Sequence, residues 1–117
     1  MSDHMLTKGR TAVITGAASG IGRAVALRLA ERGMNVVLAD VAPELDATAA
    51  DVAKVAPGGV DAVMSVRTDV ANPADLEALA AATYDRFGDC ALLMNNARAG
   101  QRRPRRQYGG LAPDNGC

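Results

Sequence analysis

The sequence predicts an α/β protein with a doubly wound parallel sheet, in the strand order 3-2-1-4, that is truncated after its fourth strand. Short apolar strands alternate with helical stretches along the chain, which is typical of a parallel sheet covered by helices on both faces. The connections are short, and right-handed crossovers between successive parallel strands then give this strand order. The 117 residues are about enough for one domain.

The first half of the chain predicts a strand, a turn, a helix and a second strand. Residues 11–15 (TAVIT) are rich in β-branched side chains and run into Gly16. Residues 21–33 are rich in Ala and Leu and predict a helix whose last residue, a glycine, caps its carboxyl end. Residues 35–40 (NVVLAD) predict a buried strand.

The second half predicts a helix over 42–56, a strand over 60–70, a helix over 72–88 and a strand over 90–96. Asn72 is expected to cap the second of these helices, because its side chain can accept hydrogen bonds from the first free amides. The apolar face of that helix is expected to consist of Leu76, Leu79, Ala80, Thr83 and Phe87.

A glycine-rich stretch, TGAASGIG, occupies residues 15–22 between the first strand and the first helix. Glycines allow a tight turn and a close approach of the backbone to a ligand. The following helix presents free amides and the positive end of its dipole, which suits a pyrophosphate. The alternative is an ordinary glycine-rich turn without a ligand.

Asp40 ends the second strand, 24 residues after Gly16. A carboxylate at this place can accept hydrogen bonds from the hydroxyls of an adenosine ribose and would repel a 2′-phosphate. Arg23 could reach such a phosphate and would soften that preference. The alternative for Asp40 alone is a solvated carboxylate at a strand end.

These residues resemble the short-chain dehydrogenases/reductases, whose fold is Rossmann-like. TGAASGIG is similar to the family's Thr-Gly-x-x-x-Gly-x-Gly turn, TDV (68–70) to the end of its third strand, and NNA (95–97) to the start of its Asn-Asn-Ala-Gly motif. The resemblance covers residues 5–97, so residues 1–97 are interpreted as the N-terminal part of an NAD(P)-binding domain.

The resemblance implies a role for each matching residue. Asp40 would hold the ribose and favour NAD, with NADP the weaker ligand. Asp69 and Val70 would contact adenine, while Asn95 and Ala97 would border the nicotinamide ribose. The residues implied to line the phosphates are Gly16, Ser19, Gly20, Ile21 and Gly22.

The sequence departs from the family in three ways. Arg98 stands where the family has glycine, and members usually run to about twice this length. The family's catalytic groups, a serine and a tyrosine followed four residues later by lysine, have no counterpart. Tyr84 is followed at that spacing by a glycine and Tyr108 by an alanine. No catalytic residue is therefore assigned, and this chain alone is expected to be inactive.

The family's alcohol or carbonyl substrates, and its tendency to form homo-oligomers, are expected only of a full-length form. The alternative function is a non-catalytic fragment that binds nucleotide or acts through association. No metal site is predicted, because His4 is the only histidine. No run reaches transmembrane length, so a cytoplasmic location without a membrane partner is expected.

Residues 98–117 form an Arg-rich stretch without periodicity, which is expected to be a disordered tail. They carry five arginines against Asp114, whereas residues 1–97 carry 8 Lys/Arg against 12 Asp/Glu. One inserted base after the Ala97 codon would turn Ala-Gly into Ala-Arg, so the stretch is hypothesised to be translated out of frame. The alternative is a polyanion-binding tail, and nucleic acid is the less favoured partner because no framework orients the arginines.

Overall fold

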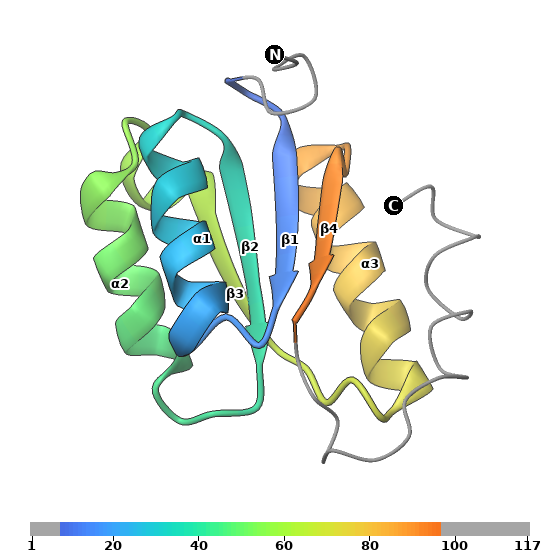
Figure 1. Cartoon of the computed structure of the whole chain (residues 1–117). Coiled ribbons are helices and arrows are strands. Elements are labelled where there is room, and N and C mark those ends of the chain that lie inside the picture. The colour runs from blue at the N-terminus through green and yellow to red at the C-terminus, as the bar shows by residue number, and fades with distance from the viewer. Residues whose placement is uncertain (1–7, 97–117) are drawn as a thin grey trace.

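The computed structural model describes residues 8–96, which form a four-stranded parallel sheet with helices on both faces (Figure 1). The strand order is β3-β2-β1-β4, and all three neighbouring pairs are parallel. The predicted fold class is therefore confirmed. The elements are β1 (Thr11–Thr15), α1 (Gly20–Glu31), β2 (Asn35–Asp40), α2 (Leu45–Val55), the 3-10 helix η1 (Gly59–Ala62), β3 (Val63–Arg67), α3 (Pro73–Phe87) and β4 (Leu92–Asn95).

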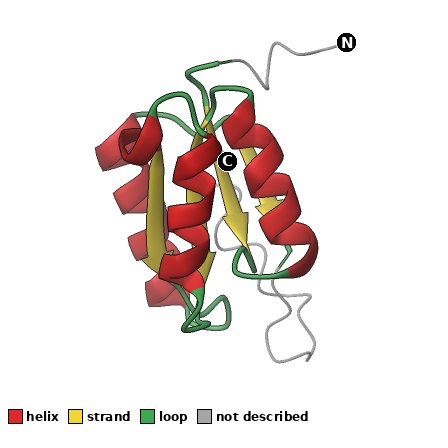
Figure 2. Cartoon of the chain, turned by 90° about the vertical axis from the view of Figure 1, so that its left-hand side faces the viewer, coloured by secondary structure: helices red, strands yellow, loops and turns green. Residues whose placement is uncertain are grey.

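The core consists of two apolar layers, one on each face of the sheet. Ile14 and Leu38 face α1 and α2, whereas Val13 and Val37 face α3 and pack with its Leu79. Successive side chains of a strand point to opposite faces, so β1 and β2 must be apolar at nearly every position. Figure 2 shows the sheet between its helices, seen from the side.

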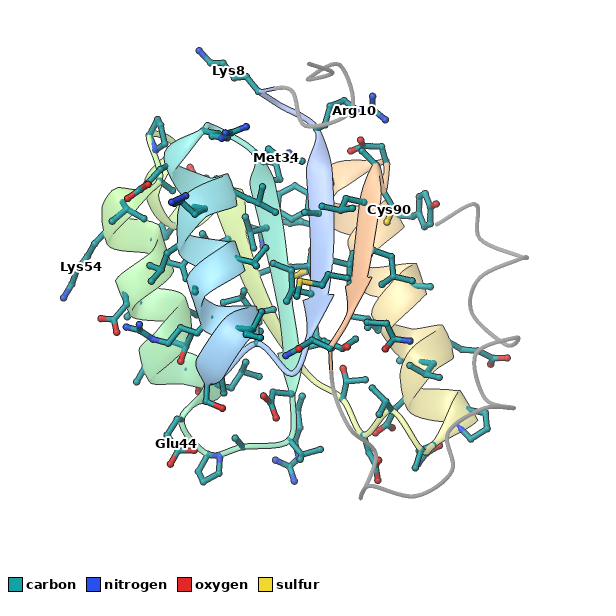
Figure 3. All side chains as sticks on the ribbon, in the orientation of Figure 1. Lys8, Arg10, Met34, Glu44, Lys54 and Cys90 are labelled. Atoms are coloured by element: carbon teal, nitrogen blue, oxygen red, sulfur yellow. The ribbon has the colours of Figure 1, made fainter. Side chains whose placement is uncertain are left out.

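The helix ends follow the predicted signals. Gly33 follows α1 with a left-handed φ of 89°. Its amide donates to the Ala30 carbonyl at 2.9 Å, and the Met34 amide donates to the Leu29 carbonyl at 3.2 Å. This pair of bonds satisfies carbonyls that the helix leaves open, and Met34 is fully buried just beyond it (Figure 3). At α3, the side chain of Asn72 accepts from the amides of residues 74 and 75.

Two predicted strands are longer than the observed ones. Of the predicted strand 60–70, only residues 63–67 pair, because Gly59 starts a 3-10 turn with a φ of 66°. The other end is set by Asp69, whose carboxylate accepts from the Ala71 amide at 2.9 Å and turns the chain toward α3. Of the predicted strand 90–96, residues 92–95 form β4.

A polar cluster joins β1 to the segment before β4. The carboxylate of Asp89 accepts from Arg10 Nε at 2.8 Å and from Thr11 Oγ1 at 2.7 Å. The Ala91 amide donates to the Thr11 carbonyl at 2.8 Å. Burial raises the pKa of Asp89. The hydrogen bonds from Arg10 and Thr11 and the charge of Arg10 lower it by more, so this pKa lies below its ordinary value of 3.8.

Within residues 8–96, no helix has the length and apolar character needed to cross a membrane.

Candidate functional site

The residues predicted to form a site lie at one edge of the sheet, where all four strands end. The arrowheads of β1 to β4 point to this edge in Figure 1. The segment between β1 and α1 crosses the edge, and the loops after β2 and β3 lie beside it. Ligands of open parallel sheets bind outside the carboxyl ends of the strands, where the strand order reverses. Here the order reverses at β1, directly at the glycine-rich turn.

The turn is built around two glycines in left-handed conformations. Gly16 has a φ of 65° and Gly20 a φ of 61°, which side chains with a Cβ rarely adopt. The Ala17 amide donates to the Ala39 carbonyl at 3.3 Å, which ties the turn to the end of β2. The turn is therefore held against the sheet by the protein's own contacts.

Beyond the turn, α1 presents unused donors. The first intrahelical bond is that of the Arg23 amide to the Ser19 carbonyl, at 3.4 Å, and no carbonyl in the described part of the chain accepts from the amides of residues 20–22. Ser19 is the N-cap, but its hydroxyl does not cap the helix. Ile21 is 67% exposed at the same place. Free amides at the positive end of a helix suit an anion.

Gly22 is buried where α1 passes closest to the turn. A Cβ at this position would overlap the carbonyl oxygen of Gly16 and lie 2.9 Å from Asn96 Nδ2. The absence of a side chain at Gly22 thus lets the helix start directly against the end of β1. This close approach brings the free amides next to the sheet edge.

The carboxylate of Asp40 has contacts in two directions. One oxygen accepts from the Ala18 amide in the turn at 2.9 Å. The other accepts from the amides of Val41 at 2.7 Å and Ala42 at 3.1 Å. Asp40 therefore braces both the turn and the loop after β2, which the sequence did not reveal. Its ribose role stays a prediction.

Asp69 and Val70 lie in the loop between β3 and α3. The Asp69 amide donates to a carboxylate oxygen of Asp75 at 2.9 Å, and Asp75 belongs to the first turn of α3. Both carboxylates are thus engaged in shaping the loop. No hydrogen bond within residues 8–96 uses the Val70 amide, which leaves this donor for a ligand.

Asn95 is the last residue of β4, and Asn96 follows it beside the turn. Asn95 is exposed, and its side-chain oxygen accepts from Thr15 Oγ1 at 3.2 Å. Asn96 was not predicted as a site residue, yet its side-chain amide donates to the Gly16 carbonyl at 3.2 Å and its backbone amide to Thr15 Oγ1 at 2.9 Å. Its place as the second Asn of NNA was the available signal. These contacts connect the glycine turn to β4.

The prediction that Arg23 could reach a 2′-phosphate meets a competing contact. Its guanidinium pairs with Asp51 of α2 at 2.9 Å, and this ion pair would compete with a phosphate for the guanidinium. Ala97 and residues 98–117 lie outside the described residues, and the predictions made for them stay predictions. Within residues 8–96, no group of His, Cys, Asp or Glu could hold a metal ion.

The turn, the strand-end carboxylate and the free helix amides together define the class of α/β domains that bind a dinucleotide. Residues 10–108 match the family described as short chain dehydrogenase. The chain belongs to the short-chain dehydrogenase/reductase family, whose members are NAD(P)-dependent oxidoreductases.

Several characterised proteins are similar to this chain. It is 45% identical over 87 residues to 1-deoxy-11-beta-hydroxypentalenate dehydrogenase of Streptomyces avermitilis, covering 74% of this chain and 31% of that protein. It is 43% identical over 89 residues to levodione reductase of Leifsonia aquatica, covering 75% and 33%. The chain thus spans about a third of the length of these relatives.

Solved structures give the same result. A short-chain dehydrogenase/reductase from Burkholderia phymatum in complex with NAD matches with a TM-score of 0.67 and 46% identity, covering 74% of this chain and 30% of that one. A glucose/ribitol dehydrogenase-type member from Brucella melitensis matches with a TM-score of 0.68 and 35% identity, covering 74% and 35%.

Proposed function

We propose that residues 8–96 bind the adenosine and pyrophosphate part of a nicotinamide dinucleotide, and that they prefer NAD to NADP. The observation that carries this proposal is the hydrogen bond between the Asp40 carboxylate and the Ala18 amide, at 2.9 Å. It fixes the strand-end carboxylate against the phosphate-binding turn. This contact supports a ribose beside Asp40 and a pyrophosphate at the turn.

The residues present fit such a cofactor. Gly22 leaves space that a Cβ would fill, and the amides of residues 20–22 and the Ser19 hydroxyl remain available for phosphate oxygens. Asp40 keeps acceptor capacity for ribose hydroxyls, since a carboxylate offers about four lone-pair sites. Asp69 and the Val70 amide would lie at the adenine, and Asn95 and Ala97 on the side of the nicotinamide ribose. The cofactor, when bound, supplies the hydride acceptor or donor.

We propose that the reaction itself, hydride exchange with an alcohol or carbonyl compound, requires a longer form of the polypeptide. The sequence contains no tyrosine followed four residues later by lysine, and such a pair supplies the proton transfer in the family that the chain resembles. The second candidate function is therefore a nucleotide-binding chain without turnover. The absence of that pair from this polypeptide favours it here.

Calorimetric titration of the purified chain with NAD and NADP tests the proposal. We expect tighter binding of NAD, because an unfavourable contact of Asp40 with a 2′-phosphate costs about 1–3 kcal/mol. Asp40→Ala should bring the two affinities together. Asp46→Ala is the matched control, since Asp46 is an exposed carboxylate that accepts from Ser65 on the neighbouring strand.

Circular dichroism would first establish that each variant folds. Equal affinities of the unaltered chain for NAD and NADP, or an unchanged ratio in Asp40→Ala, would refute the ribose role. The same samples, assayed for cofactor reduction across alcohols, separate the two candidate functions, because clear turnover would contradict the non-catalytic one.

A further inference from the structure

We infer that Arg67 limits the preference for NAD, by offering its guanidinium to a 2′-phosphate on the adenosine ribose. This inference rests on the proposed function. It assigns to β3 a cation that opposes the charge of Asp40 at the same subsite. The chain should accordingly retain measurable affinity for NADP, and that affinity should depend on Arg67.

The placement of Arg67 follows from the sheet register. Arg67 is the last residue of β3 and pairs with Asp40, the last residue of β2. Adjacent strands lie about 4.8 Å apart, and paired residues of neighbouring strands project to the same face. Both side chains also contact the same loop: Arg67 Nη1 donates to the Val41 carbonyl at 2.9 Å, while Asp40 accepts from the amides of Val41 and Ala42.

The guanidinium is available for a ligand. Arg67 is exposed, and a guanidinium carries five N–H donors, of which the Val41 carbonyl uses one. Arg67 takes part in none of the ion pairs formed within residues 8–96. Arg23, at the start of α1, is instead paired with Asp51 at 2.9 Å.

With both Asp40 and Arg67 at this subsite, NADP binding should be weakened but not abolished. A carboxylate accepts from ribose hydroxyls but repels a phosphate, whereas a guanidinium binds phosphate oxygens through parallel N–H donors. A 2′-phosphate held beside Asp40 would lie at the end of β2, next to the paired residue Arg67 at the end of β3. NAD carries no group there, so its affinity should not depend on this arginine.

Titrations of NAD and NADP into Arg67→Gln and the unaltered chain, each at low and high salt, test the inference. We expect Arg67→Gln to weaken NADP binding by about 5- to 20-fold and to leave NAD within about twofold, since a charge-assisted contact at an exposed site is partly screened. NADP binding should also lose part of its salt dependence. Arg67→Lys, which keeps the charge but not the fork, should give an intermediate NADP affinity.

Arg86→Gln is the matched control, because Arg86 also donates to a backbone carbonyl, that of Asp61 at 3.2 Å, but lies in the last turn of α3. An equal loss for NAD and NADP in Arg67→Gln would overturn the inference and limit Arg67 to holding the loop after β2. Unchanged NADP binding would overturn it as well. If the unaltered chain binds neither dinucleotide, the proposed function fails, whereas normal NAD binding with no effect of Arg67 refutes the inference alone.

Discussion

Gly22 is the residue at which the site tolerates least change. A Cβ there would meet a backbone carbonyl, that of Gly16, which cannot move aside as a flexible side chain can. Gly22→Ala should therefore lower the free energy of unfolding by about 3 kcal/mol, at the upper end for overpacking, and should abolish dinucleotide binding. Urea denaturation and the NAD titration measure the two effects.

Gly58→Ala is the control for this substitution. Gly58 is exposed, has an ordinary φ of −84°, and its Cβ would meet only the Cβ of Ala62, at 3.1 Å. Gly58→Ala should change the free energy of unfolding by less than about 1 kcal/mol. A Gly22→Ala chain that unfolds at the same urea concentration as the unaltered chain would show that α1 can shift away from β1.

At the scale of single residues, the sequence predicted which residues meet at the carboxyl ends of the strands, but not the contacts between them. Asp40 could be placed by its spacing from the turn, because strand ends converge at one edge of a parallel sheet. Its hydrogen bond to the Ala18 amide depends on how the turn folds back, and no spacing rule contains that. Asn96 was missed for the same reason, since its reach to the Gly16 carbonyl exists only once β4 pairs with β1.

At the scale of elements, Asp89 holds β4 to the start of β1. The pKa of its carboxyl is lowered in the folded chain, so its contribution to stability is present above about pH 4 and is lost as the pH falls through the folded value. Asp89→Asn should lower the free energy of unfolding at pH 7 by about 1 kcal/mol, a modest value because Arg10 is half exposed.

Urea denaturation at pH 7 and at pH 3 measures this effect. The difference between Asp89→Asn and the unaltered chain should shrink at the lower pH, where the carboxyl takes up its proton. Asp85→Asn, at an exposed position of α3, should show neither the loss nor the pH dependence. A difference in the free energy of unfolding that stays constant between the two pH values would mean that packing, and not the charge of Asp89, stabilises the contact between β1 and the segment before β4.

The existence and order of the elements were predictable, whereas some of their ends were not. Asn72 and Gly33 are local signals that act within one turn, and both were confirmed. The ends of β3 depend on a 3-10 turn at Gly59 and on the contact of Asp69 with the Ala71 amide. The turn and the hydrogen bond end β3 although the apolar pattern of the sequence continues on both sides of it.

At the scale of the whole molecule, β4 has a described neighbour on one side only. It pairs with β1, and Leu92, Leu93 and Met94 are only partly buried. An apolar strand without charge or proline at a sheet edge tends to pair with another chain. We therefore expect the purified chain to self-associate, with a mass by light scattering that rises with concentration.

Leu93→Lys should reduce this association, because a lysine at the edge can extend its charge to solvent and disfavours a second strand. Met64→Lys on β3, the opposite edge strand, is the control, since Met64 packs against the same apolar layer as Leu93 and its substitution should leave association through β4 unchanged. A monodisperse monomer whose amides in residues 92–95 are strongly protected from hydrogen exchange would contradict the prediction.

The strand order could be predicted because handedness and short connections leave few arrangements. How the chain continues at the β4 edge could not, since residues 97–117 carry no periodic pattern.

The bridge formed by Asn96 has a thermodynamic consequence. Its side chain holds the Gly16 carbonyl and its backbone holds Thr15, so detachment of β4 removes two of the contacts that stabilise the closed turn. A solute that binds only the closed turn must then also disfavour detachment of β4, by mass action. Occupancy of the turn and attachment of the edge strand are therefore linked equilibria, and the coupling is reciprocal: whatever secures β4 tightens the turn for its ligand.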